Sequence, residues 1–121
     1  MILGVGIDVT EIARIGRASE RPAFLLRCFT EAERTYAGVG KEASRRLAAR
    51  FAAKEATFKA LGVGASRSRW QEAEVVRRGG GVTVALTGGL RERLLALGGQ
   101  TLHLSFSHGK DVAVAVVVVE S

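Results

Sequence analysis

The stretch KEASRRLAARFAAKEATFKAL, residues 41–61, decides how the rest of the chain must be arranged. Leu47, Phe51 and Phe58 recur along it at helical spacing and fall on one stripe. Gly62 follows the last of these turns, and glycine is the residue that most often closes a helix. We therefore predict one long helix over residues 41–61, against which the other elements pack.

An acidic residue interrupts the apolar stripe of this helix. Glu55 lies between Phe51 and Phe58, where a carboxylate is costly to bury unless it is paired, hydrogen-bonded or bound to a metal. Lys59 follows at i+4, and an exposed Glu–Lys pair at this spacing stabilises a helix by roughly 0.2–0.5 kcal/mol. A surface ion pair is one explanation, but it does not account for the flanking phenylalanines. A functional carboxylate is the other.

A strand with two unequal faces is predicted at the start of the chain, from Ile2 to Val9. One face carries Leu3, Val5, Ile7 and Val9, and the other carries Ile2, Gly4, Gly6 and Asp8. The second face is nearly bare before its carboxylate, so another backbone or a ligand can approach it closely. Thr10 is predicted to cap a helix that runs to about Arg17.

The rest of the pattern predicts short helices and antiparallel strands. Thr30 and Glu33 have the spacing of a capping box, which opens a helix ending near Ala37. The last strand is apolar on both faces, so we expect it to be central or buried in an interface. The other predicted segments are a helix at Arg21–Phe29, a polar loop at Ser66–Arg69, strands at Ala73–Arg77 and Val82–Leu86, a helix at Leu90–Leu97, and a hairpin of Thr101–Ser107 with Val112–Val119. The predicted fold class is α+β, in a single domain spanning residues 1–121.

Composition narrows the classes of partner. The 121 residues carry a formal net charge of +6, which favours an anionic partner such as nucleic acid, a phosphorylated small molecule or an acidic protein. The arginines are dispersed and aromatic residues make up only 6%, so we predict no nucleic-acid partner. The apolar run Val112–Val119 is shorter than the ~20 residues that a membrane-spanning helix needs. The first residues lack the basic start of a signal peptide, so we expect a cytoplasmic protein with no membrane partner.

Two acidic residues on separate elements indicate a metal site. If Asp8 and Glu55 converge, their carboxylates offer the hard oxygen ligands that Mg²⁺ prefers. That ion often combines one or two carboxylates with substrate phosphate oxygens and water, so such a site suits a phosphate-bearing substrate. Ser107 and His108 lie at the turn of the final hairpin. A histidine there can contact a substrate phosphate or act as a base, and the structural alternative is a local hydrogen bond within the turn.

Three blocks of the sequence together resemble the family of holo-[acyl-carrier-protein] synthases. Residues 6–15, GIDVTEIARI, look like the N-terminal block of that family. Residues 50–62, RFAAKEATFKALG, resemble its central motif, Phe/Trp-x-x-Lys-Glu-Ala-x-x-Lys. Residues 105–108, SFSH, with Ala113, Ala115 and Glu120, resemble its C-terminal block. The likeness covers essentially the whole chain and is weakest over residues 65–99, where Gly79-Gly80-Gly81 stands in place of the family's frequent glycine and proline.

The resemblance implies a 4′-phosphopantetheinyl transferase fold, in which an antiparallel sheet packs with a long central helix. It implies a magnesium-dependent enzyme of fatty acid and lipid biosynthesis, which moves the 4′-phosphopantetheine moiety of coenzyme A to a serine of apo acyl carrier protein. The other product would be adenosine 3′,5′-bisphosphate. Family members of this short type form homotrimers whose active sites lie between subunits.

The same resemblance implies roles for individual residues. Asp8 and Glu55 would hold Mg²⁺ against the pyrophosphate of coenzyme A. Lys59 would stabilise charge in the transition state or help to accept the serine proton. Arg50, Ser107 and His108 would bind coenzyme A, while Arg14, Arg17 and Arg21 would dock the acidic carrier protein. The general base, the natural carrier protein and the tolerance for acyl-coenzyme A donors stay open.

Two other functions remain as alternatives. A small basic nucleic-acid-binding module would need a contiguous arginine stripe, and it would leave Asp8 and Glu55 without a role. A structural subunit could keep the fold without the chemistry, but every motif residue named above is present in the sequence.

Overall fold

The structure is a computed structural model that describes the backbone of residues 1–121 and the side chains of all residues except Arg67 and Ser68. Its elements, in chain order, are β1 (Ile2–Glu11), α1 (Ile12–Ala18), α2 (Pro22–Cys28), α3 (Glu31–Ala37), α4 (Lys41–Leu61), α5 (Arg67–Glu72), β2 (Ala73–Arg78), β3 (Gly81–Leu86), α6 (Gly88–Ala96), β4 (Thr101–His108) and β5 (Val112–Glu120). The predicted α+β class is confirmed. The long helix has the predicted bounds, and Gly62 closes it with a φ of 68°, in the left-handed region.

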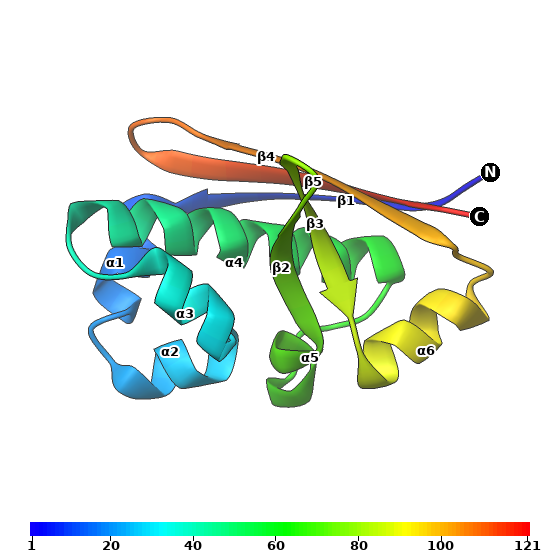
Figure 1. The fold of residues 1–121 in the computed structure, drawn as a ribbon, viewed down its shortest axis with the longest axis horizontal. Coiled ribbons are helices and arrows are strands. Elements are labelled where there is room, and N and C mark those ends of the chain that lie inside the picture. Colours follow the sequence, from blue (N-terminus) through cyan, green and yellow to red (C-terminus); the bar gives the residue numbers. More distant parts are fainter.

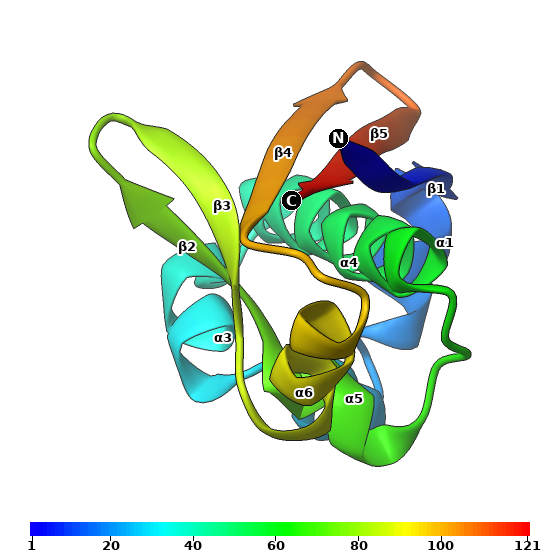
Figure 2. The ribbon, with the colours of Figure 1, turned by 90° about the vertical axis from the view of Figure 1, so that its right-hand side faces the viewer.

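The long helix α4 lies between an antiparallel sheet and a group of shorter helices. The sheet has the strand order β1-β5-β4, so the predicted central place of the last strand is confirmed. In Figure 1 the sheet lies above α4, and α2, α3, α5 and α6 lie below it. Figure 2 views α4 more nearly along its axis and shows the β2–β3 hairpin as separate from the three-stranded sheet. No helix of the described chain is long and apolar enough to cross a membrane.

The glycine face of β1 packs directly on the backbone of α4, as its bare surface predicted. A Cβ atom on Gly4 would lie 2.0 Å from the carbonyl oxygen of Ala60, and one on Gly6 would lie 1.9 Å from that of Ala56. Both distances are far below van der Waals contact, so only glycine allows the strand and the helix to lie this close. This contact brings the end of β1, with Asp8, against the middle of α4.

On β1 and β5 the opposite face of the sheet is apolar and uncovered by other elements of the described chain. Val5, Ile7 and Val9 of β1 are 59%, 56% and 62% exposed. They pair in register with Val118, Val116 and Val114 of β5, whose side chains are partly exposed on the same face. Contiguous apolar patches of this kind on a sheet mark a surface that binds another protein.

Two local predictions are wrong. Thr10 does not cap α1, because it continues β1 opposite Ala113 and is buried there, and Glu11 occupies the N-cap position without a side-chain cap. The predicted polar loop at Ser66–Arg69 is instead the start of helix α5. Its Trp70 stacks on the ring of Phe51 with centroids 4.9 Å apart, so burial of an aromatic ring supports a helix where the local sequence is polar.

Candidate active site

Asp8 brings polar side chains from two elements to one place. Its Oδ2 accepts a hydrogen bond from the hydroxyl of Thr10 at 2.6 Å. Its Oδ1 lies 3.2 Å from Nζ of Lys59, which also donates to the carbonyl of Ile7 at 2.9 Å. Lys59 therefore pairs across to β1, and not with Glu55 one turn earlier in its own helix, as a simple surface pair would. This contact ties α4 to β1 at the carboxylate.

Glu55 is half-buried beside this pair. Burial raises the pKa of the Glu55 carboxyl above its ordinary value, and the negative charge of Asp8 raises it further. The positive charges of Lys59 and Arg14 act in the opposite direction. The structure thus brings Asp8, Glu55 and Lys59, the three predicted catalytic residues, within electrostatic range of one another.

The two carboxylates fit the donor set of a magnesium site. Asp8 and Glu55 repel each other in a partly desolvated place, and a divalent cation between them would relieve this repulsion. Among the described residues, no group of three or more His, Cys, Asp or Glu side chains could hold a metal. Mg²⁺ needs only one or two carboxylates when phosphate oxygens and water complete its shell. The residues present therefore fit an open site that a phosphate-bearing substrate completes.

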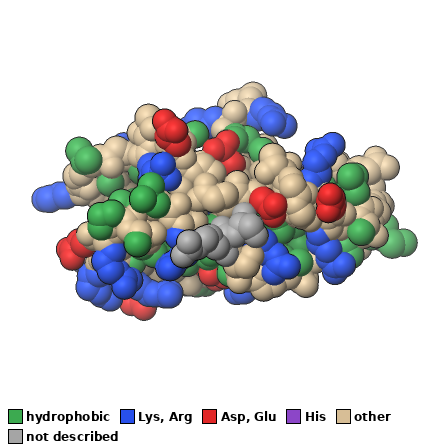
Figure 3. Space-filling model, turned by 90° about the horizontal axis from the view of Figure 1, so that it is seen from below, with side chains coloured by type: hydrophobic (Ala, Val, Ile, Leu, Met, Phe, Trp, Pro, Cys, Tyr) green, Lys and Arg blue, Asp and Glu red, His purple; other side chains and the backbone are tan. Residues whose placement is uncertain are grey.

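The three arginines predicted to dock a carrier protein line one cavity of about 440 Å³ beside α1 and α2. Arg14, Arg17 and Arg21 are joined there by Arg27, which belongs to none of the sequence motifs. The apolar part of the lining comes from Ile15, Ala18, Phe24 and Phe51. Figure 3 shows this helical side of the molecule, with Lys and Arg side chains gathered at the end where Figure 1 places α1 and α2. Arg14, which lines this cavity, also acts electrostatically on the Glu55 carboxyl.

Arg50 lies in a second arginine cluster, on another side of α4. Its guanidinium lies over the ring of Tyr36, 4.2 Å from the centroid, and 5.8 Å from the centroid of Phe106. Arg46 and Arg77 also lie over Tyr36, at 6.0 and 5.1 Å, and Arg77 donates to the phenolic oxygen. Burial lowers the pKa of Arg50, and the hydrogen bond from Arg77 lowers the pKa of Tyr36. The cluster holds three positive charges close together, an arrangement that attracts an anion.

The remaining two predicted residues lie at the end of β4. His108 is opposite Ala113 in the sheet register and shares a face with Phe106, which contacts Arg50. Ser107 is opposite Val114 and points to the other, uncovered face of the sheet. Both side chains are exposed. The structure therefore divides the predicted site into a carboxylate group with Asp8, an arginine-lined cavity on α1 and α2, and a group around Arg50.

The side chains that complete the two arginine clusters come from distant parts of the chain and could not be identified from the sequence. Arg27, Arg46, Arg77 and Tyr36 complete the two arginine clusters, yet none of them belongs to a quoted motif. The positive net charge favours an anionic partner, but the arginines are dispersed in sequence and gather only in the fold.

The sequence matches the family model of the 4′-phosphopantetheinyl transferase superfamily over residues 4–117. A holo-[acyl-carrier-protein] synthase of Anaeromyxobacter dehalogenans is 43% identical over 125 residues, which cover 99% of this chain and 97% of that protein. A second, from Desulforudis audaxviator, is 46% identical over 121 residues, covering 98% of this chain and 92% of the relative.

The structure is similar to solved structures of the same kind of enzyme. The crystal structure of a holo-(acyl-carrier-protein) synthase from Bacillus anthracis, in complex with CoA (3′,5′-ADP), is 36% identical with a TM-score of 0.82, and the match covers 100% of this chain and 98% of that one. The holo-[acyl-carrier-protein] synthase from Neisseria meningitidis is 32% identical with a TM-score of 0.87, and the match covers 100% of both chains.

Proposed function

The chain belongs to the 4′-phosphopantetheinyl transferase superfamily, and on that premise we propose that it transfers the 4′-phosphopantetheine moiety of coenzyme A to a serine of apo acyl carrier protein. Its relatives of 43–46% identity over nearly the whole chain are holo-[acyl-carrier-protein] synthases, and one similar structure is a complex with CoA (3′,5′-ADP). The observation that carries the proposal is the meeting of Asp8, Glu55 and Lys59 where β1 crosses α4.

The transfer exchanges one phosphorus–oxygen bond for another. The serine Oγ gives its proton to a base and bonds to the β-phosphorus of coenzyme A, the bond from that phosphorus to the bridging oxygen breaks, and adenosine 3′,5′-bisphosphate leaves with the electron pair of that bond. When bound by Asp8 and Glu55, Mg²⁺ would neutralise negative charge on the pyrophosphate. Lys59 holds an ammonium beside Asp8, where it stabilises the charge that develops on the phosphate oxygens. Positioning and charge neutralisation are the main needs of such a reaction.

We expect the acidic carrier protein to dock at the arginine-lined cavity. Arg14, Arg17 and Arg21 surround a partly apolar floor, which suits a helix that presents carboxylates around apolar side chains. Since Arg14 acts electrostatically on Glu55, a carrier bound there would place its serine next to the carboxylates. Coenzyme A would be held at its other end by Arg50 and His108, with Ser107 nearby, and the charges of Arg46 and Arg77 add to that attraction.

The uncovered sheet face supports a homotrimer with active sites between subunits. Glu55 and Arg50 are five residues apart on α4, so their side chains point about 140° apart around the helix. One chain therefore presents its carboxylates and its Arg50 cluster in different directions, and a neighbouring copy can bring the two together. Packing of copies through the valine face would also remove from water a patch that the described chain leaves exposed.

Replacing Val116 with lysine should separate these subunits. Val116 is in the middle of the valine face, opposite Ile7, and a charge buried there without a partner costs several kcal/mol. We expect a folded monomer in sedimentation velocity and loss of most of the transfer activity. Val39→Lys is the matched control, because that valine is exposed in the segment between α3 and α4. A Val116→Lys protein that remains an active trimer would remove this face from the assembly.

We place the reaction in the cytoplasm and in fatty acid and lipid biosynthesis, with residues 1–121 acting as one phosphopantetheinyl transferase domain. The family match over residues 4–117 supports the single domain, and the relatives that are holo-[acyl-carrier-protein] synthases support the place in lipid biosynthesis.

Intact-mass spectrometry of an apo acyl carrier protein tests the proposed function. With this protein, coenzyme A and Mg²⁺, the carrier should gain the mass of one phosphopantetheine group. The gain should vanish with a chelator and be restored by added Mg²⁺. Replacing Arg17 with glutamate should raise KM for the carrier while leaving KM for coenzyme A unchanged. No gain with several different carrier proteins, with the protein folded, would contradict the proposed activity.

A further inference from the structure

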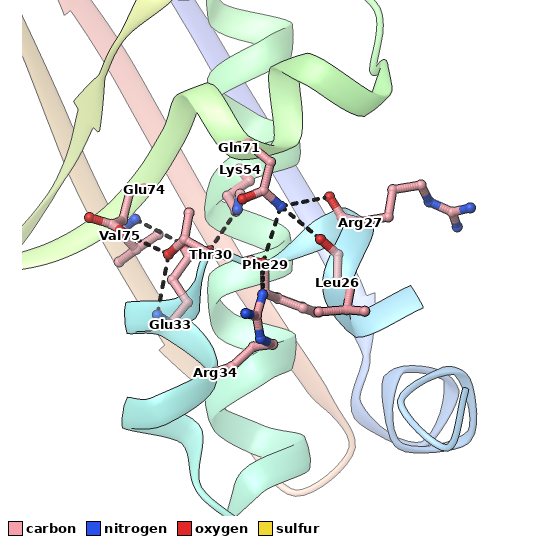
Figure 4. Close-up of polar contacts among 10 residues, drawn as sticks. All are labelled: Leu26, Arg27, Phe29, Thr30, Glu33, Arg34, Lys54, Gln71, Glu74 and Val75. Carbon is pink, nitrogen blue, oxygen red and sulfur yellow. Dashed lines mark hydrogen bonds and ion pairs between the residues drawn. The ribbon is translucent and has the colours of Figure 1, made fainter. Parts of the chain in front are cut away.

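A fully buried ion pair lies on the side of α4 away from the sheet. Nζ of Lys54 is 2.7 Å from Oε1 of Glu33, and both side chains are 0% exposed. The same Oε1 accepts the backbone N–H of Thr30 at 2.9 Å, and Oε2 accepts the backbone N–H of Val75 at 2.8 Å. Figure 4 shows the carboxylate among these donors. One carboxylate thus joins α3, α4 and β2.

Net stability does not account for this pair. Taking two charges out of water costs about as much as their attraction returns, and apolar side chains of similar volume are often as stable or more so. Burial lowers the pKa of Lys54, although the charge of Glu33 opposes this effect. Lys54 also has no place in the transfer chemistry described above, since it points away from Asp8. The pair therefore contributes something other than net stability or chemistry.

The packing surface of α4 explains why a directional contact such as the Lys54–Glu33 ion pair affects the position of this helix. The side of α4 that faces the sheet is alanine, at positions 48, 49, 52, 53, 56 and 60, and the side that carries Lys54 is formed by Leu47, Phe51, Phe58 and Leu61. Helix packing is fixed by side-chain ridges that enter grooves, and alanine gives only shallow ridges. On the sheet side the helix can therefore turn or slide by a small amount with little loss of packing, so its orientation depends on the contacts of the other side, which carries Lys54. A salt bridge of 2.7 Å permits much less movement, because its strength depends on distance and direction.

Glu55 lies between two fixed sides of this helix. On one side the backbone of β1 rests on Ala56 and Ala60. Lys54 is two residues before Ala56 and therefore about 200° around the helix from it, since successive residues are about 100° apart. Its side chain thus points to nearly the opposite side of α4. Glu55 follows Lys54 directly, so any turn of α4 at Lys54 moves the Glu55 carboxylate relative to Asp8.

We propose that the Lys54–Glu33 ion pair is a positioning element that fixes the rotation and axial placement of α4, and so holds Glu55 at the distance from Asp8 that a metal requires. The inference rests on the proposed function, because it gives Glu55 the role of metal ligand. A displacement of about 1 Å at a catalytic centre can lower the rate by about 100-fold, so a small movement of α4 is sufficient to matter.

The double variant Glu33→Gln/Lys54→Met tests this role. It removes both charges and keeps similar volumes, and the amide oxygen still accepts one of the two backbone N–H groups that Glu33 accepts. The other N–H loses its acceptor, so we expect a somewhat less stable but folded protein with a cooperative thermal transition. Binding of Mn²⁺ in the presence of 3′,5′-ADP, followed by the electron paramagnetic resonance of free Mn²⁺, should weaken at least tenfold. Thr57→Val is the matched control on the same helix, because Thr57 is buried and its hydroxyl donates to the Ala53 carbonyl within α4. We expect this control to bind Mn²⁺ as the unmodified protein does.

Each outcome decides the proposal. A folded double variant with unchanged Mn²⁺ binding overturns it. If the double variant does not fold, Lys54→Arg is measured instead: it keeps the charge but lengthens the side chain, so it should fold, with Mn²⁺ binding weakened. If neither variant folds, the pair is needed for the fold itself and the positioning role is withdrawn. Unmodified protein that binds no Mn²⁺ would remove both the metal site and this inference, whereas a failure confined to the variants leaves the proposed function standing.

Discussion

Replacing Glu55 with glutamine should lower phosphopantetheine transfer by roughly 10³-fold, the upper end of what the loss of one charge-stabilising group costs an enzyme. The amide keeps the volume of the side chain but loses the negative charge that a cation needs. The measurement is the rate of mass gain on apo acyl carrier protein at saturating Mg²⁺ and coenzyme A. Asp8→Ala should have an effect of similar size, because it removes the second carboxylate and the partner of Lys59.

The fold should survive this change. Because the folded-state pKa of Glu55 is raised, its ionised form opposes folding above its ordinary pKa, and this opposition fades as the pH falls through the raised value. The Glu55→Gln protein lacks this contribution, so in the absence of metal it should be at least as stable as the unmodified protein at neutral pH. Thermal melts at neutral and acidic pH check this sign. Glu42→Gln, near the start of the same helix and exposed, is the control. Full activity of Glu55→Gln would exclude Glu55 from the mechanism.

Gly6→Ala should destabilise the protein by about 3 kcal/mol or more, at the high end for overpacking of a core. Its Cβ would meet the carbonyl oxygen of Ala56 at 1.9 Å and the backbone nitrogen of Ala60 at 2.8 Å. These are backbone atoms, so no side chain can rotate away and the strand must move from the helix. We expect the thermal midpoint to fall by more than about 10 °C in a calorimetric scan.

Gly64→Ala separates this contact from the general effect of adding a methyl group. A Cβ atom on Gly64 would meet no atom of the described chain within 4 Å, so this change should leave the midpoint nearly unaltered. A Gly6→Ala protein as stable as Gly64→Ala would mean that β1 and α4 are not in backbone contact.

Local patterns predicted the elements well and their partners poorly. The bounds of α4 could be predicted because its stripe and its terminal glycine are contiguous in sequence. The capping box of Thr30 and Glu33 is present for the same reason. The ion pair of Glu33 with Lys54 was not predicted, since nothing in a single sequence marks which of several lysines reaches a carboxylate 21 residues away.

The candidate site shows the same division. A close approach to β1, by a backbone or by a ligand, could be predicted from Gly4 and Gly6, because only an absent side chain permits it; the structure shows that the backbone of α4 makes this approach. That Lys59 pairs with Asp8 and not with Glu55 depends on how two elements cross, which no local spacing contains. Helix α5 escaped prediction because the burial of Trp70 against Phe51 outweighs the polar character of its own sequence.

The pairing of β1 with β5 affects how the chain folds while it is being synthesised. Val5 faces Val118 and Val9 faces Val114, so the sheet partner of the first strand is made more than 100 residues later. A ribosome adds about 5–20 residues per second, which leaves β1 with an unpaired backbone and an apolar face for several seconds. Helix α4 is complete by Leu61 and can cover the glycine face of β1 during that interval. Until β5 is made, the nascent chain is therefore open to strand-to-strand aggregation along the unpaired backbone of β1, most of all before α4 is complete, and α4 then shields one face of that strand.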